Sequence, residues 1–146
     1  MKFLIDTECW LWSLAEPGRL NSEAQAALVS ADNEIYLSAV SSWEIAIKAA
    51  ISKLALPEPP AVYVPKRMAS ENIRSLPIEH THALRVYSLP THHKDPFDRL
   101  LIAQAQTEAL PIMTADRQFA NYDVQLIWAD HGHSPEQIGT FKEEEN

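Results

Sequence analysis

Apolar residues along the chain fall into five short runs, separated by longer stretches in which apolar and polar residues are mixed. The runs are too short and too uniformly apolar to alternate between a buried and an exposed side. That pattern is typical of strands covered on both faces, as in a parallel sheet. We expect strands at residues 2–6, 34–38, 73–78, 110–115 and 124–129.

Between these runs, apolar residues recur at helical spacing, and several segments open with residues that commonly start helices. Asn21 or Ser22 can cap one of them, and a proline-rich turn precedes another. We expect helices over residues 21–31, 41–56, 60–72, 81–89 and 96–109. Strands that alternate with helices in this way predict a mainly parallel sheet with helices on both faces. Such sheets bind ligands outside the carboxyl ends of their strands.

Four acidic residues occupy positions that meet at one edge of such a sheet. Asp6 ends the first expected strand, and Asp116 follows the fourth. Glu44 and Asp98 fall in the first turns of two expected helices. Because helix N-termini and the carboxyl ends of strands share an edge in a parallel α/β sheet, we expect these four carboxylates to lie close together.

Helix capping is a competing explanation for each of these acids. Asp6 can cap the segment after the first strand, and Asp116 can cap a short helix over residues 116–122. Ser41 and Glu44 match the S-x-x-E capping box. Capping does not require four carboxylates at one place, where they repel one another and raise each other's pKa. A divalent cation such as Mg²⁺ or Mn²⁺ would neutralise them, because these ions take oxygen ligands.

The segment HHKDPFDRLLIAQAQ, residues 92–106, admits both explanations. Asp95 is placed to be the N-cap of a helix, and Pro96 suits the first helical position, where no N–H is needed. Asp98 then lies in the first turn, where the helix dipole favours an acid. We assign Asp95 to capping and keep Asp98 as a candidate ligand.

The distribution of charge favours a cation site over a surface that attracts nucleic acid broadly. The chain has 146 residues, with 20 acidic residues against 12 Lys and Arg and a net charge of −8. Residues 130–146 hold five acids and one Lys, which is typical of a solvated tail. Without this tail and the four candidate acids the chain is neutral. We expect one domain over residues 1–130, followed by an acidic tail over residues 131–146.

Cysteine usage and hydropathy indicate a cytoplasmic protein that is not inserted in a membrane. Cys9 is the only cysteine and cannot form an internal disulfide, so we give it no catalytic role. No segment approaches the roughly 18 apolar residues of a membrane span, and the N-terminus lacks the uninterrupted apolar stretch of a signal peptide.

Four segments form a joint pattern: FLIDTECWLW, SAVSSWEIAIK, HHKDPFDRLLIAQA and IMTADRQFANY. Together they resemble the PIN-domain proteins, specifically the VapC-like toxins of type II toxin–antitoxin systems. The first resembles the family's opening strand with its D-T pair, and the second its S-x-x-S-x-W-E-I segment. The third is close to D-P-F-D-R-x-[IL]-x-A-Q-A, and the last resembles the closing T-x-D-x-x-F motif.

This resemblance implies an α/β/α sandwich and a metal-dependent ribonuclease that a cognate antitoxin holds inactive. Asp6, Glu44, Asp98 and Asp116 match the family's four acids, which implies that they hold Mg²⁺ or Mn²⁺ and carry catalysis. The metal would polarise an RNA phosphodiester and lower the pKa of the attacking water. Glu8 is a departure, because this subgroup more often has His or Asn at that position. We also expect a homodimer.

Other polar residues receive structural interpretations. We expect His92 and His93 to be exposed loop residues, because neither has a partner at the H-x-x-x-H spacing or a Cys partner. Lys48 follows Glu44 by four residues, so the two can form an ordinary helical ion pair, although Lys48 could contact RNA instead. Solvated helix faces are the expected positions of three further cations that could also contact phosphate: Lys66, Arg67 and Arg99.

Two other classes of protein compete with the nuclease. A receiver-like signalling domain also places Mg²⁺-binding acids at the strand ends of a parallel sheet. It normally has two adjacent acids after the first strand and a Lys at the end of the last, whereas this chain has LIDTE and LIWAD at these places. A non-catalytic PIN-like binding module is the other alternative, and the presence of all four acids disfavours it.

Overall fold

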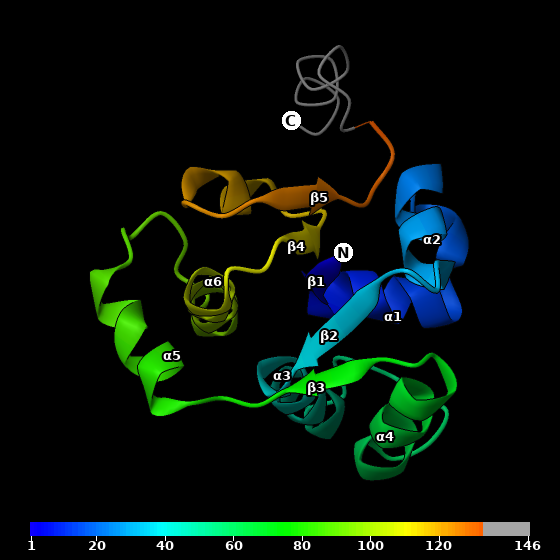
Figure 1. Cartoon of the computed structure of the whole chain (residues 1–146). Helices are drawn as coiled ribbons and strands as arrows, with labels where there is room; N and C mark the ends of the chain where they lie inside the picture. Colours follow the sequence, from blue (N-terminus) through cyan, green and yellow to red (C-terminus); the bar gives the residue numbers. More distant parts are fainter. Residues whose placement is uncertain (133–146) are drawn as a thin grey trace.

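The computed structural model describes residues 1–132. Five strands form one sheet in the order β3-β2-β1-β4-β5, and every neighbouring pair is parallel (Figure 1). The strands are β1 (Lys2–Ile5), β2 (Glu34–Ser38), β3 (Arg74–Leu76), β4 (Ile112–Thr114) and β5 (Leu126–Trp128). The expected five-stranded parallel sheet is confirmed. Part of the expected acidic tail, residues 133–146, lies outside the described residues.

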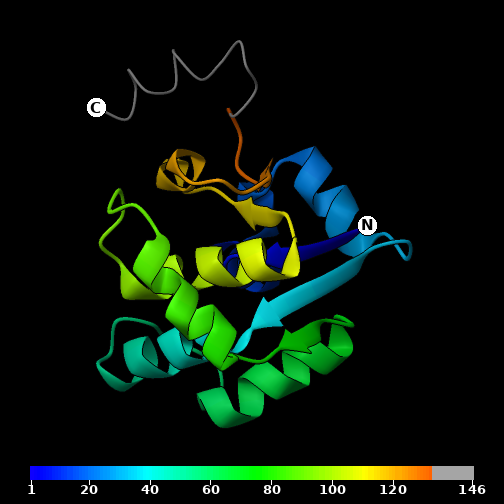
Figure 2. The same ribbon diagram turned by 60° about the vertical axis from the view of Figure 1, so that its left-hand side comes forward.

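Helices cover both faces of this sheet (Figures 1 and 2). The α-helices are α1 (Thr7–Ala15), α2 (Ser22–Val29), α3 (Ala39–Ala50), α4 (Pro60–Ser70), α5 (His80–Arg85) and α6 (Pro96–Glu108). Three short 3₁₀ helices are η1 (Pro17–Arg19), η2 (Val86–Ser88) and η3 (Arg117–Asn121). The three-layer α/β/α arrangement implied by the family resemblance is therefore present.

Two apolar cores lie on opposite faces of the sheet because successive strand residues point to opposite sides. Phe3 and Ile5 of β1 belong to the core shared with α1 and α2. Leu4, between them, belongs to the core under α6. All three side chains are fully buried. The central strand is therefore covered on both sides, as its continuous apolar sequence predicts.

The observed helices differ from the expected ones mainly at their ends. The helix expected over residues 41–56 is α3, which begins directly after β2 and ends at Ala50. The segment expected as one helix over residues 81–89 is α5 followed by η2, and α1 was not among the expected helices. α6 agrees with the prediction to within one residue, because Asp95 and Pro96 mark its start.

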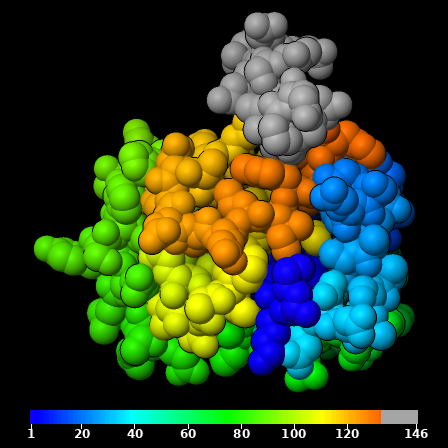
Figure 3. All heavy atoms as spheres, turned by 45° about the horizontal axis from the view of Figure 1, so that its top comes forward, coloured from blue at the N-terminus to red at the C-terminus, as the bar shows by residue number. Residues whose placement is uncertain are grey.

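The start of the chain lies away from the carboxyl ends of the strands. The N-terminal amine of Met1 donates to the carbonyl of Asp32, 3.1 Å away. Figure 3 shows the first residues, in dark blue, at the surface beside the lighter blue α2–β2 region. Among residues 1–132, no helix is long and apolar enough to cross a membrane.

Candidate active site

The candidate site lies beside β1, at the point where the order of the strands in the sheet reverses. From the central β1 the chain first builds β2 and β3 on one side and later β4 and β5 on the other. In such a sheet the crevice between the two halves opens at the carboxyl ends of the strands and is the usual ligand site. Asp6 follows β1 directly, and Asp116 lies two residues beyond the end of β4. Their neighbourhood is therefore a consequence of the strand order.

Asp6 is held by β4 rather than by helix capping. Its N–H donates to the carbonyl of Met113 at 2.9 Å, and its Oδ2 accepts from Oγ1 of Thr114 at 2.8 Å. Asp6 precedes α1, yet its side chain accepts no capping hydrogen bond. Burial raises its pKa to about 7, with Glu44 and Asp116 adding to the rise and Thr114 opposing it. The capping interpretation of Asp6 is therefore wrong.

Glu44 reaches the same place from the second turn of α3. The N-cap of α3 is Ser38, whose Oγ accepts from the N–H of Val40 at 2.9 Å, so the expected capping box of Ser41 with Glu44 is wrong. The helix starts earlier than expected because β2 runs directly into it. Glu44 is buried, and Lys48 Nζ lies 2.6 Å from its Oε2, which confirms the expected ion pair.

Asp95 and Asp98 have different roles at the start of α6. Oδ1 of Asp95 accepts from the N–H groups of Phe97 and Asp98 at 2.8 and 3.2 Å, which confirms Asp95 as the N-cap. The carboxylate of Asp98 is left to face the crevice. The pKa of Asp98 is raised to about 9, first by burial and then by its acidic neighbours, of which Asp6 contributes most. A group in such surroundings favours a positive partner.

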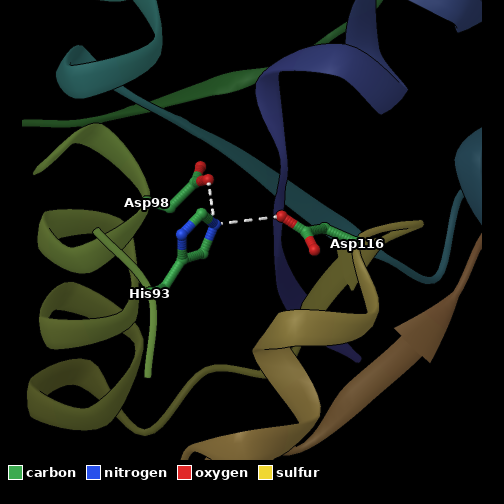
Figure 4. Close-up of side chains that lie close together, drawn as sticks. All are labelled: His93, Asp98 and Asp116. Atoms are coloured by element: carbon green, nitrogen blue, oxygen red, sulfur yellow. Dashed lines mark hydrogen bonds and ion pairs between the residues drawn. The ribbon is translucent and has the colours of Figure 1, made fainter. Parts of the chain in front are cut away.

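Asp116 caps a short helix, as expected, and also lines the cleft. Its Oδ1 accepts from the N–H of Gln118 at 2.9 Å and so caps η3. Its Oδ2 points in the opposite direction, toward the crevice (Figure 4). Capping and a place in the candidate site are compatible for this residue, because the two oxygens serve different partners.

His93 is a site residue that the sequence interpretation missed. Its Nε2 lies 2.7 Å from Oδ2 of Asp98 and 3.1 Å from Oδ2 of Asp116, between the two carboxylates (Figure 4). Only 11% of its side chain is exposed, so the expectation of an exposed residue is wrong for His93, whereas His92 is exposed as expected. The available signal was its position two residues before the N-cap, since that loop must pass beside the first turn of α6.

The acids line one part of a cleft of about 990 Å³. The acidic residues in its wall are Asp6, Glu8, Glu16, Glu44, Asp95, Asp98, Asp116 and Asp130. Cations lie elsewhere along the wall: Arg19, Lys48, Lys53 and Arg117. The cleft thus combines a concentrated negative site with positive side chains around it.

This donor set fits a divalent cation. The ligand atoms on offer are carboxylate oxygens, which Mg²⁺ and Mn²⁺ prefer. Asp6 is buried and Asp98 partly buried, and the pKa of each is raised, first by burial and then by the neighbouring acids. Three possible ligand atoms lie within 4.8 Å of one another: one carboxylate oxygen of Asp98, one of Asp116, and a ring nitrogen of His93. A bound cation would relieve this repulsion.

Comparison with known proteins decides the family. The family model of the PIN domain matches residues 3–125, which is most of the chain. The chain belongs to the PIN-domain family. A curated relative, the ribonuclease VapC22 of Mycobacterium tuberculosis, is 30% identical over 120 residues, covering 82% of this chain and 90% of VapC22. Ribonuclease VapC16 of the same organism is 44% identical over 61 residues, only 42% of this chain and 43% of VapC16.

Solved structures show the same PIN-domain fold. VapBC2 from Rickettsia felis, bound to a DNA fragment from its promoter, aligns with a TM-score of 0.68 at 15% identity and covers 89% of this chain and 100% of that chain. FitAcB from Neisseria gonorrhoeae aligns with a TM-score of 0.59 at 19% identity, covering 88% and 97%. Membership of the PIN-domain family excludes the receiver-like interpretation of the acidic edge.

Proposed function

We propose that this PIN domain is an endoribonuclease toxin that hydrolyses RNA phosphodiesters with a divalent cation, Mg²⁺ or Mn²⁺. The observation that carries the proposal is the convergence of Asp6, Glu44, Asp98 and Asp116 on one cleft at the carboxyl edge of the sheet. The names of the relatives, ribonucleases VapC22 and VapC16, support the same chemistry. We assign the four acids as metal ligands and catalytic residues.

The four acids would hold the cation, and neighbouring residues of the chain orient two of these carboxylates. When bound, a cation of this kind polarises a phosphodiester and lowers the pKa of a bound water. Thr114 fixes one oxygen of Asp6, and Gln118 fixes one oxygen of Asp116, so both carboxylates are oriented before any ligand arrives. Hydrogen bonds of this kind orient the ligands of a metal site and raise its affinity. The proposed reaction needs no Ser or Cys nucleophile, because water is the attacking group.

The cations of the cleft would hold the RNA backbone. Lys53 is exposed in the cleft wall, just beyond the end of α3. Lys48 lies closer to the acids and is paired with Glu44. Phosphate contacts of this kind supply affinity that falls with salt and carry no sequence information. Because RNA is the substrate, the proposed site of action is the cytoplasm.

A cognate antitoxin is the proposed partner. Two further structural neighbours, from Klebsiella pneumoniae and Mycobacterium tuberculosis, are described as a toxin–antitoxin complex and as a member of the VapBC family of toxin–antitoxin systems, which supports a partner for this chain. An Arg of the partner could enter the acidic cleft and form charge-assisted hydrogen bonds with the carboxylates, replacing the cation. Co-expression with the antitoxin should then relieve toxicity, whereas harmless expression of an active, folded protein would contradict the toxin assignment.

We also propose a homodimer through the outer face of α3. Trp43, Ile47 and Ile51 follow one another at four-residue spacing and are 52%, 37% and 56% exposed. A stripe of large apolar side chains on a helix surface is typical of a protein interface. Light scattering on the purified chain, with Ile47→Asp as the variant, should show a dimer that the substitution converts to a monomer.

The test of the nuclease is RNA cleavage by the purified chain, freed of any bound partner. We expect cleavage in Mg²⁺ or Mn²⁺, no cleavage in EDTA, and cleavage by Asp98→Asn that is slower by roughly 10²-fold or more in either ion. A folded wild-type protein that binds RNA but leaves it intact in both ions would instead favour the non-catalytic PIN-like binding module.

A further inference from the structure

His93 enters the site from the loop between η2 and α6, and its Nε2 contacts the carboxylates of two acids. Nε2 contacts Oδ2 of Asp98 at 2.7 Å and Oδ2 of Asp116 at 3.1 Å (Figure 4). The imidazole also packs edge-on against the buried ring of Phe119, with 6.2 Å between the ring centroids. Two acids that are far apart in the sequence are thus connected by one side chain.

The loop is anchored by contacts that do not involve this imidazole. The N–H of His93 donates to the hydroxyl of Tyr122 at 2.8 Å. The guanidinium of Arg99 donates to the carbonyl of Pro90 at 2.8 Å. A substitution at position 93 therefore removes the ring and leaves both anchors in place. The position of the ring is set by the fold, and the ring can be changed without releasing the loop.

The other ring nitrogen indicates which role His93 has. The N–H of Asp95 points to Nδ1 of His93 at 3.4 Å, so Nδ1 is the acceptor. In a neutral imidazole the proton is then on Nε2, which donates to Oδ2 of Asp116 and lies 2.7 Å from Oδ2 of Asp98. A metal-binding Nε2 would require the proton on Nδ1, where it would face the N–H of Asp95 instead of an acceptor. The surroundings favour a hydrogen-bond donor over a metal ligand.

We propose that His93 is a positioning residue that holds Asp98 and Asp116 at the separation and orientation needed to bind the cation. This inference rests on the proposed function. The bridge uses Oδ2 of each carboxylate, and no hydrogen bond from residues 1–132 reaches Oδ1 of Asp98, which is left to a ligand. Without the bridge, the two acids would face each other with no group between them, and cation binding would have to order them.

The test measures Mn²⁺ binding by calorimetry to the wild type and to three variants. His93→Ala removes the donor and should weaken binding by roughly 10- to 100-fold, the usual cost of losing a hydrogen bond to a metal ligand. His93→Gln offers an amide N–H at a similar distance from the backbone and should restore most of that loss. His92→Ala removes the exposed neighbouring ring and is the matched control, with binding unchanged. Wild-type affinity in His93→Ala would overturn the proposal.

A spectroscopic measurement separates a donor from a ligand. Electron spin-echo envelope modulation of the Mn²⁺ complex detects a directly coordinated imidazole nitrogen. We expect no such coupling in the wild type, and a coupling that disappears in His93→Ala would make His93 a ligand and overturn the positioning role. The melting temperature of His93→Ala in EDTA should remain close to that of the wild type, because the loop anchors remain.

Asp98→Asn distinguishes failure of this inference from failure of the proposed function. If Asp98→Asn loses Mn²⁺ binding while His93→Ala keeps it, the metal site stands and the role of His93 is refuted. If both variants bind Mn²⁺ like the wild type, the proposed function itself fails at these residues.

Discussion

α3 and α6 both deliver an acid to the same cleft, but they do so by different local arrangements. At α6, Asp95 caps the helix and Asp98 faces the cleft from the first turn. At α3, Ser38 is the cap, and Glu44 reaches the cleft from the second turn together with its partner Lys48. The position at which a helix begins determines which of its later side chains face the site. The acid follows the cap by three residues at α6 and by six residues at α3. The two helices can be compared directly by substitution.

The largest expected difference is between the two acids at the start of α6. Asp98→Asn should lower the rate of RNA cleavage by roughly 10²–10³-fold or more, the scale for loss of a principal electrostatic contact at a reacting centre. Asp95→Asn should leave the rate within a few-fold of the wild type, because Asn caps a helix as well as Asp does. Initial rates in Mn²⁺ provide the measurement, and equal losses in both variants would contradict the division of roles.

The second prediction concerns stabilisation by the cation. Mg²⁺ or Mn²⁺ at about 100 times its Kd should raise the free energy of unfolding of the wild type by ~2.7 kcal/mol. The double variant Asp6→Asn with Asp98→Asn should gain nothing, because it lacks two ligands, although its metal-free form should be as stable as the wild type or slightly more so. Thermal unfolding with and without the ion measures this, and equal shifts would place the ion elsewhere.

The third prediction is the pH dependence of the metal-free protein. The pKa values of Asp6 and Asp98 rise to about 7 and about 9 on folding. The folded state therefore binds more protons than the unfolded state above about pH 4, so stability should fall as the pH rises toward 9. For one group the slope is at most about 1.4 kcal/mol per pH unit.

Urea unfolding in EDTA at pH 5, 7 and 9 checks this sign. Asp98→Asn should have a shallower slope than the wild type, because it lacks one of the two titrating groups. Stability that increases over this range in the wild type would contradict the prediction that burial and mutual repulsion dominate at the site.

The smallest expected change in stability comes from the ion pair of α3. Lys48→Met should cost about 1 kcal/mol, because Lys48 is 47% exposed whereas Glu44, which loses its partner, is only 8% exposed. The loss of Lys48 should also weaken RNA binding, measured in the inactive Asp98→Asn variant. The slope of the logarithm of the binding constant against the logarithm of the salt concentration should become smaller in magnitude by about one. Lys66→Met, which breaks the exposed pair with Glu58, is the matched control and should leave the slope unchanged.

The sequence by itself determined much of this protein, because several signals are local. A short apolar run such as residues 3–5 predicts a strand buried on both faces, and the pair Asp95–Pro96 marks the start of α6 to the residue. The positions of Asp6 and Asp116 after strands were enough to predict that they share an edge. These inferences require only short-range geometry and the rule that parallel strands end together.

Only the tertiary structure decided the features that depend on distant contacts. Whether Asp6 caps a helix or accepts from Thr114 is decided by the pairing of β1 with β4, which are separated by over a hundred residues. His93 carries no ligand spacing in the sequence, and its place between two carboxylates follows from where its loop is anchored on Tyr122. Hydrogen bonds between distant segments depend on packing, which a local pattern does not record.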